Sequence, residues 1–223
     1  MKPFAGESEE YRRARNELLE AELELRRQIE RVAAQRRDLP LGRKVTVDYE
    51  FDGVDGPVRL SELFEDGKDT LFLYSFMFTP GEQGVPLEVA CPSCTSIIDG
   101  LDGALPHITQ RINAAVVAMA PIEQFRAHAR ARGWRHARLL SSLHNTYHRD
   151  YQTEDDDGGQ LPIATVFTRR GGEIHHFWSC ELFGAPTDPG AHPRHVDFMW
   201  PVWAVFDVTP EGRGTDWNPS LAY

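Results

Sequence analysis

The sequence predicts an α/β fold with a parallel core, and two observations lead to this prediction. Residues 70–78 and 112–119 are largely apolar runs of strand length, typical of strands that are covered on both faces. Each run is followed by a stretch in which apolar residues have helical spacing, over about 94–101 and 122–129. Strands that alternate with helices in this way are typical of a parallel sheet flanked by helices.

The stretch from about Glu9 to Asp38 predicts one long helix. Ser8 suits the N-cap position, and Leu39-Pro40 ends the helical pattern. Apolar residues recur every three or four positions, at Tyr11, Ala14, Leu18, Ala21, Leu25, Ile29 and Val32. The helix either lies along its own domain or forms a homodimer contact. The heptad register breaks at Gln28, which disfavours a self-standing coiled coil.

The segment between this helix and the first apolar run predicts a strand and turns. Apolar and polar side chains alternate over residues 45–51, which predicts a half-buried strand. Asp52-Gly53 and Asp55-Gly56 are turn signals. Residues 79–90, after the first apolar run, contain glycine and proline and predict a loop.

The second half of the chain predicts a helix, a loop, a hairpin and a short final helix. Pro121 opens a helix that ends near Gly133. The acidic run 154–157 is able to bind a hard cation but is more typical of a solvated loop. Leu161-Pro162 opens an antiparallel hairpin that ends near residue 178, and a further helix begins near Pro201.

The motif that carries chemistry is Cys91-Pro92-Ser93-Cys94, placed between the first apolar run and the helical pattern. A helix N-terminus offers unpaired N–H groups and a partial positive charge, and both favour a thiolate over a thiol. If Cys91 is the N-cap, Pro92 occupies the first helical position, where its missing N–H costs nothing. We expect Cys91 to be the exposed attacking sulfur with a low pKa. We expect Cys94, one turn along, to be the partly buried resolving sulfur.

The same two cysteines allow other interpretations. They could form half of a zinc site or be inert helix residues, but a structural zinc needs four ligands, and the sequence has no second Cys-x-x-Cys. The third cysteine, Cys180, is isolated in the sequence, and no histidine spacing points at the pair. A peroxidatic cysteine is disfavoured because neither cysteine follows a Pro-x-x-x-Thr/Ser-x-x lead-in. The strand–motif–helix context favours a redox dithiol, with no metal and no cofactor.

Composition limits the partners. The 223 residues include 34 acids and 24 bases, a formal net charge of −10, which argues against nucleic acid or an anionic membrane as a partner. No stretch has the apolar length of a membrane span, and residues 1–8 lead into charged sequence with no apolar signal core. We therefore expect a cytoplasmic protein. In that compartment a cysteine pair is more often catalytic or metal-binding than a structural disulfide.

The order strand, Cys-x-x-Cys, helix, strand, helix and proline-opened hairpin resembles the thioredoxin-like superfamily. The resemblance implies a central sheet flanked by helices, with residues 1–40 as an N-terminal helical arm and 41–223 as a thioredoxin-like domain with a C-terminal extension. It also implies that Pro162 stands in the place of the cis-proline beside the dithiol. Pro92, Leu161 and Pro162 would then shape the substrate groove, and the backbone of Leu161 would pair with a substrate peptide.

Short blocks along nearly the whole chain also resemble one uncharacterised bacterial family, domain of unknown function eight-nine-nine. The blocks are Tyr11–Arg15, Arg36–Pro40, Tyr49–Gly53, Phe76–Phe78, Cys91–Cys94, Asp99–Gly103, Arg170–Glu173 and Asp207–Arg213. Two departures from thioredoxin are notable. Ala90 stands where thioredoxin has Trp, and the order Cys-Pro-x-Cys is similar to glutaredoxins. Pro162 follows Cys94 by 68 positions, which favours an elaborated branch with an insertion around residues 141–159.

The sequence as a whole predicts a thiol–disulfide oxidoreductase that uses Cys91 and Cys94 on a protein or small-molecule disulfide. The alternative is a non-catalytic thioredoxin-like protein that senses redox state or binds a partner. No nucleic acid or membrane partner is expected, and the N-terminal helix is the candidate contact for a homodimer.

Overall fold

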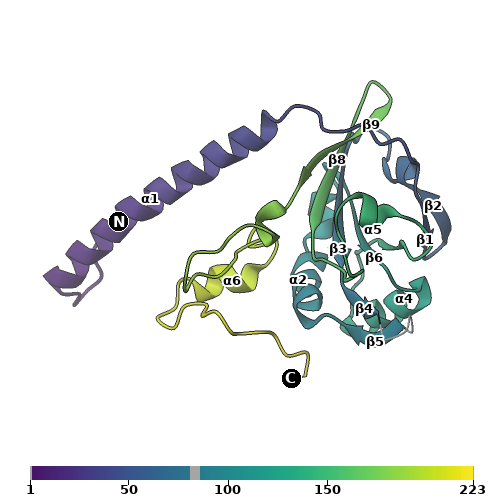
Figure 1. Ribbon diagram of the computed structural model, residues 1–223. Coiled ribbons are helices and arrows are strands. Elements are labelled where there is room, and N and C mark those ends of the chain that lie inside the picture. The colour runs from purple at the N-terminus through teal and green to yellow at the C-terminus, as the bar shows by residue number, and fades with distance from the viewer. Residues whose placement is uncertain (1, 81–85, 223) are drawn as a thin grey trace. The chain divides into compact units, whose positions relative to one another are not determined.

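The chain divides into two compact units, Met1–Pro40 and Leu41–Tyr223, in a computed structural model that describes residues 2–80 and 86–222. The first unit contains α1 (Glu9–Arg37), as the apolar spacing predicts (Figure 1). The side chain of Ser8 accepts a hydrogen bond of 3.1 Å from the N–H of Tyr11, which caps the first turn. Acidic residues in the first turn and basic residues in the last turn offset the helix dipole.

The second unit is built on a seven-stranded sheet of order β2-β1-β7-β6-β3-β8-β9 (Figure 1). Its strands are β1 (Glu50–Gly53), β2 (Gly56–Arg59), β3 (Thr70–Phe76), β6 (Asn113–Ala118), β7 (Leu139–Ser141), β8 (Ala164–Arg170) and β9 (Glu173–Ser179). β3, β6 and β7 are parallel, and the other neighbouring pairs are antiparallel. Two helices make the crossovers between the parallel strands, α2 (Pro92–Asp102) and α4 (Ile122–Arg132). This is a thioredoxin-like α/β fold, as predicted.

Short elements connect and extend this frame. They are η1 (Leu60–Leu63), α3 (Leu105–Ile108), α5 (Tyr147–Asp150), η3 (Glu181–Phe183) and α6 (Pro201–Phe206). The helix predicted to start at Pro121 is confirmed as α4, and Gly133 ends it with a φ of +78°. The hairpin predicted after Pro162 is confirmed as β8–β9, and its turn uses Gly171 and Gly172, both with positive φ.

The loop predicted over residues 79–90 is wrong where the structure describes it. β4 (Phe78–Pro80) and β5 (Pro86–Ala90) pair as an antiparallel hairpin, and residues 81–85 lie outside the described part. Proline reads as a loop signal in sequence, but a two-stranded ribbon has free edges on which a missing N–H costs no ladder bond. The dithiol is thus presented by a hairpin that leads directly into α2.

The sheet separates two apolar cores because successive side chains of a strand point to opposite faces. Leu71 and Leu73 of β3 pack with Phe51, Phe167 and other residues of one cluster. Tyr74 and Phe76 pack in the other cluster, with side chains of α2, α4 and the C-terminal segment. The second cluster therefore supports the helix that carries the dithiol.

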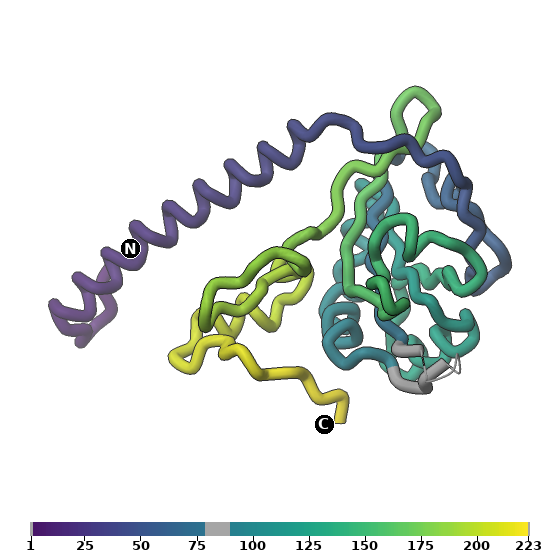
Figure 2. Tube along the Cα trace, viewed as in Figure 1, coloured from purple at the N-terminus to yellow at the C-terminus, as the bar shows by residue number. Residues whose placement is uncertain are grey.

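The C-terminal segment covers α2. Figure 2 follows the chain from β9 into this segment, drawn in green to yellow. Trp200 and Trp203, with ring centroids 4.9 Å apart, belong to the same core cluster as Cys94. The indole N–H of Trp200 donates a hydrogen bond of 3.0 Å to the hydroxyl of Ser96 in α2.

Among the described residues, no helix has the length and apolar character needed to cross a membrane.

The apolar face of α1 suits a second copy of the same helix. No residue of α1 is buried, and Leu18 and Leu25 are 52% and 60% exposed. Residues 9–24 carry six acids and three bases, and residues 25–37 carry one acid and five bases. Antiparallel pairing of two copies would bring the acidic half of one helix against the basic half of the other. The homodimer through α1 stays a prediction.

We predict that Leu18→Glu weakens this dimer by at least about 100-fold, because both copies lose a buried leucine and gain a buried charge. Sedimentation equilibrium over a concentration series measures the dissociation constant. Asn16→Glu is the matched control: it adds the same charge on the opposite face of α1 and should leave the dimer intact. Monomers at all concentrations for the parent protein would contradict the prediction.

Candidate active site

Cys91 is the N-cap of α2, and Pro92 occupies the first helical position, as predicted. The N–H of Cys91 donates a hydrogen bond of 3.0 Å to the carbonyl of Met77. The carbonyl of Cys91 accepts hydrogen bonds from the N–H and the hydroxyl of Thr95, each of 2.9 Å. These bonds fix the backbone on both sides of the sulfur. Cys91 is half-buried, Cys94 is completely buried, and neither is in a disulfide.

The surroundings of the two sulfurs separate their pKa values. A hydrogen bond from the thiol of Cys94, together with the N–H groups of Cys94 and Ser93, lowers the pKa of Cys91 to about 6, against the opposing effect of burial. Burial raises the pKa of Cys94 well above its usual value. At neutral pH the pair is therefore one thiolate and one thiol, with the thiol donating to the thiolate.

Tyr74 lies beneath the pair, and the sequence analysis missed it. Its hydroxyl donates a hydrogen bond of 3.3 Å to the sulfur of Cys94, and both side chains are completely buried. Burial raises the pKa of Tyr74 well above its usual value, so the phenol stays neutral. The sequence holds only a small signal for this role. Tyr74 places a single hydroxyl on the face of the apolar strand that also carries Phe76.

A second polar link joins the first turn of α2 to α4. The hydroxyl of Thr95 lies 3.1 Å from Nε2 of His128. Because Thr95 gives its only hydroxyl proton to the carbonyl of Cys91, its oxygen accepts from Nε2–H of His128. The His128 ring packs against aromatic side chains that include Phe76 and Trp134, and burial lowers its pKa. A neutral histidine thus supports the backbone that holds Cys91.

Two aspartates hold the other end of α2. The carboxylate of Asp102 accepts three backbone hydrogen bonds of 2.9 Å, from residues 135, 136 and 137. Asp99 accepts from the indole of Trp134 at 2.7 Å and pairs with Arg132 of α4. These bonds tie α2 to α4 and to the turn before β7, so the helix that carries the dithiol is fixed at both ends.

The segment of Leu161 and Pro162 is placed beside the end of β3, but the predicted cis bond is wrong. All peptide bonds of the described residues are trans. The N–H of Ile163 donates to the carbonyl of Leu161 at 3.0 Å, a γ-turn centred on Pro162, whose fixed negative φ suits that turn in the trans form.

Leu161 differs from the expectation in a second respect. Its N–H donates to the carbonyl of Thr153 at 2.8 Å and is not available to pair with a substrate strand. Leu161 is half-buried and Pro162 is buried. The amide of Gln160 exchanges two hydrogen bonds with the backbone of Phe78, which joins this segment to the hairpin before Cys91. The role of Pro92, Leu161 and Pro162 in a substrate groove stays a prediction.

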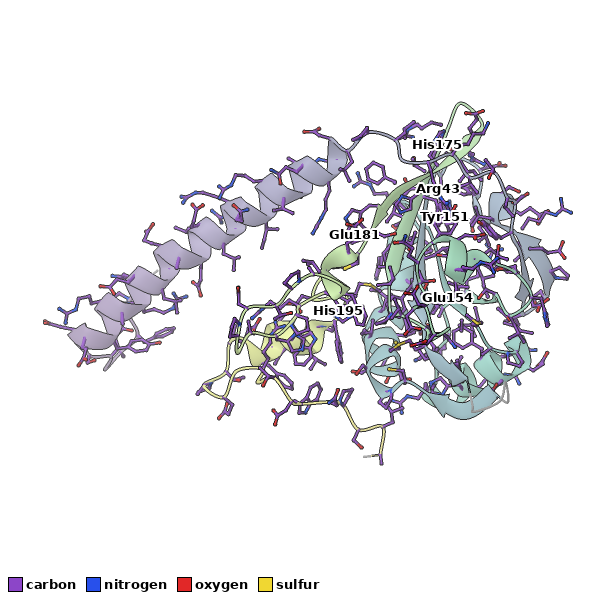
Figure 3. All side chains as sticks on the ribbon, in the orientation of Figure 1. Arg43, Tyr151, Glu154, His175, Glu181 and His195 are labelled. Atoms are coloured by element: carbon purple, nitrogen blue, oxygen red, sulfur yellow. The ribbon has the colours of Figure 1, made fainter. Side chains whose placement is uncertain are left out.

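A buried histidine, His148, contacts the residue that is hydrogen-bonded to Leu161. His148 is 2% exposed, and its Nδ1 lies 2.8 Å from the hydroxyl of Thr153, the residue that receives the Leu161 N–H. Burial lowers the pKa of His148 to about 4. Nearby, the guanidinium of Arg43 lies 4.7 Å from the ring centroid of Tyr151 (Figure 3).

The remaining candidates do not gather into a site. Cys180 is buried, and its thiol donates to the carbonyl of His195. In the acidic run, the Asp155 carboxylate accepts from the N–H groups of Asp157 and Gly159 and stabilises a turn. Among the side chains that the structure describes, no three of His, Cys, Asp or Glu are arranged to hold a metal ion.

The family model described as "Bacterial protein of unknown function (DUF899)" matches residues 1–223. No curated protein matches the sequence. Among solved structures, the chain is similar to peroxidoxin BcpB from Mycobacterium tuberculosis, with 18% identity, a TM-score of 0.45, and 73% of this chain and 95% of that chain covered. For the bacterioferritin comigratory protein of Xanthomonas campestris, these values are 12%, 0.46, 64% and 86%. For the reduced 2-Cys peroxiredoxin of Plasmodium vivax, they are 22%, 0.43, 60% and 81%. These likenesses are too distant to carry an argument about activity.

We predict that Cys91 alkylates with an inflection near pH 6, because the hydrogen bonds from Cys94 and the helix N-terminus stabilise its thiolate. The rate of reaction with iodoacetamide, followed by mass spectrometry from pH 4 to 10, measures it. Cys94→Ala should move the inflection toward the free-cysteine value of about 8.5. An inflection that is the same in both proteins would show that Cys94 does not act on Cys91.

A second prediction concerns pH and stability. The unfolded chain protonates His148 below about pH 6.5, whereas the folded chain keeps it neutral down to about pH 4. The stability that neutral His148 supports is therefore complete above pH 6.5 and is lost as the pH falls toward 4, by on the order of 3 kcal/mol. Urea unfolding at several pH values measures it. His148→Gln should flatten this dependence, and His107→Gln, at an exposed position, should not; parallel profiles for all three proteins would contradict the prediction.

Proposed function

Since the chain belongs to the bacterial family DUF899, whose description gives no activity, we propose from the geometry of its dithiol that the protein is a thiol–disulfide oxidoreductase. One observation carries the proposal. Cys91 has a pKa lowered to about 6 at the N-terminus of α2, and the thiol that lowers it, Cys94, is buried one turn along. An attacking thiolate beside a protected second thiol is the arrangement that dithiol exchange requires.

In the first step, the Cys91 thiolate attacks one sulfur of a substrate disulfide. A bond forms between Cys91 and that sulfur, the substrate S–S bond breaks, and the other substrate sulfur leaves as a thiolate. The pKa of Cys91 favours this step at neutral pH, because most molecules then carry Cys91 as a thiolate. A thiolate whose pKa lies near the ambient pH is also a good nucleophile.

In the second step, Cys94 attacks Cys91. The proton of the Cys94 thiol passes to the departed substrate thiolate, and the resulting Cys94 sulfur forms a bond with Cys91. The substrate sulfur held on Cys91 leaves and takes a proton from water. The dithiol has then given two electrons to the substrate, and the Cys91–Cys94 disulfide is returned to the dithiol by an external thiol reductant.

The substrate is a disulfide of a protein or a small molecule. Pro92 is exposed beside Cys91, and the Leu161–Pro162 segment is joined by hydrogen bonds to the hairpin that precedes it, which supports a groove formed by these three residues. The Cys-Pro-x-Cys order and the neutral first turn of α2 place no fixed charge next to Cys91. A reducing compartment such as the cytoplasm would keep the dithiol ready to react.

The alternative from another class is a redox sensor, which oxidises once and does not cycle. The buried, fixed position of Cys94 supports exchange, because a sulfur held by α2 at one turn from Cys91 resolves a mixed disulfide without a large movement. The two functions differ in turnover, and this difference decides between them.

We predict that the protein catalyses multiple turnovers of insulin disulfide reduction with dithiothreitol as reductant. Cys91→Ser should abolish turnover, because the attacking sulfur is lost. Cys94→Ser should stop the cycle at a mixed disulfide on Cys91, detectable by mass spectrometry. Cys180→Ser is the matched control: it also removes a buried thiol, but one outside the dithiol, and should leave turnover intact. One oxidation per chain without turnover would identify a sensor instead.

A further inference from the structure

We propose that Tyr74 is a further catalytic group of this site, the hydrogen-bond donor that enables the buried sulfur of Cys94 to resolve the mixed disulfide. The inference rests on the proposed exchange reaction and extends it to the control of its second step.

The contact is set by two elements, β3 and α2. Tyr74 comes from β3, at the centre of the sheet, and points to the face covered by α2. Cys94 lies in the first turn of that helix, and its sulfur is 3.3 Å from the Tyr74 oxygen, a hydrogen-bond distance for sulfur. Both side chains are completely buried, so water does not compete for either atom.

The direction of this bond follows from proton counting. The Cys94 thiol has one proton, and it is directed at the Cys91 thiolate. The sulfur of Cys94 therefore acts as an acceptor toward Tyr74, and the phenol gives it its only proton. The three groups form a chain in which Tyr74 donates to Cys94 and Cys94 donates to Cys91.

The hydrogen bond from Tyr74 to Cys94 matters most once Cys91 has reacted. In the mixed disulfide Cys91 no longer carries a negative charge, so the reason for the Cys94 proton to point at it is lost. Cys94 must then become a thiolate in surroundings that disfavour charge. The Tyr74 hydroxyl is already aimed at the sulfur where that charge develops, and a neutral donor stabilises it without adding a second buried charge. The electrons and protons of the exchange are unchanged, because Tyr74 keeps its own proton throughout.

The test separates the two steps of the reaction. The parent and Tyr74→Phe are mixed with a stoichiometric amount of a chromogenic aromatic disulfide. The first attack releases one coloured thiolate, and decay of the mixed disulfide releases the second. We expect Tyr74→Phe to slow the second release about tenfold and to change the first by less than about threefold, because the ring is kept and only the donor to Cys94 is removed.

The matched control is Tyr147→Phe. Tyr147 is also completely buried, but it packs in the cluster on the opposite face of the sheet. Removal of its hydroxyl should change stability without changing the ratio of the two rates. If Tyr74→Phe slows both steps equally or neither, the proposal is overturned, and a structural role for Tyr74 remains.

A second variant covers the case in which Tyr74→Phe does not fold. Site-specific replacement of Tyr74 by 2,3-difluorotyrosine keeps the hydroxyl and makes it a stronger donor, so decay of the mixed disulfide should become faster than in the parent. An unchanged or slower decay would overturn the proposal. Failure of the parent to form any mixed disulfide would instead overturn the exchange function itself, so the two failures are distinguishable.

Discussion

The alternation of side chains along β3 is the constraint on which the rest of the site depends. β3 pairs with β6 over six residues and with β8 over five, so its register is held from both sides. A shift of one residue would turn Tyr74 and Phe76 to the far face and bring Leu73 under α2. The same pleat that completes two apolar cores therefore decides which polar atom meets the buried cysteine.

The two cysteines are one helical turn apart, yet their pKa values are shifted in opposite directions. Cys91 is at the end of α2, where backbone N–H groups are available to its sulfur, and Cys94 is inside the core beneath the same turn. Burial, which opposes ionisation at both positions, is offset at Cys91 by hydrogen bonds and is dominant at Cys94. No Lys, Arg, His, Asp or Glu side chain contributes to either shift, so the asymmetry comes from the interaction of the two sulfurs with each other, from backbone position and from depth.

What the sequence predicts well is local. The N-cap at Cys91, the proline after it and the glycine that ends α4 each depend on a few neighbouring residues, and the apolar runs determine which strands are central. The predictions that fail are those in which residues far apart in the sequence determine the local conformation or the contact. The trans form of the Leu161–Pro162 bond accompanies hydrogen bonds to Thr153 and within its own γ-turn. The partner of Tyr74 depends on how α2 packs on β3. The strands β4 and β5 lie in a stretch of sequence, residues 79–90, whose proline and glycine content is typical of a loop.

The cover that Trp200 and Trp203 provide for α2 has a consequence for biosynthesis. The helix of residues 92–102 and the strands beside it leave the ribosome about a hundred residues before the side chains that close over Ser96. Until then one apolar flank of α2 faces solvent, and the dithiol is carried on an element whose packing is incomplete. The redox pair therefore acquires its final environment late, through contacts of long sequence separation that form slowly. We therefore expect newly made chains to be more open to oxidation and to non-native pairing of their cysteines than mature ones.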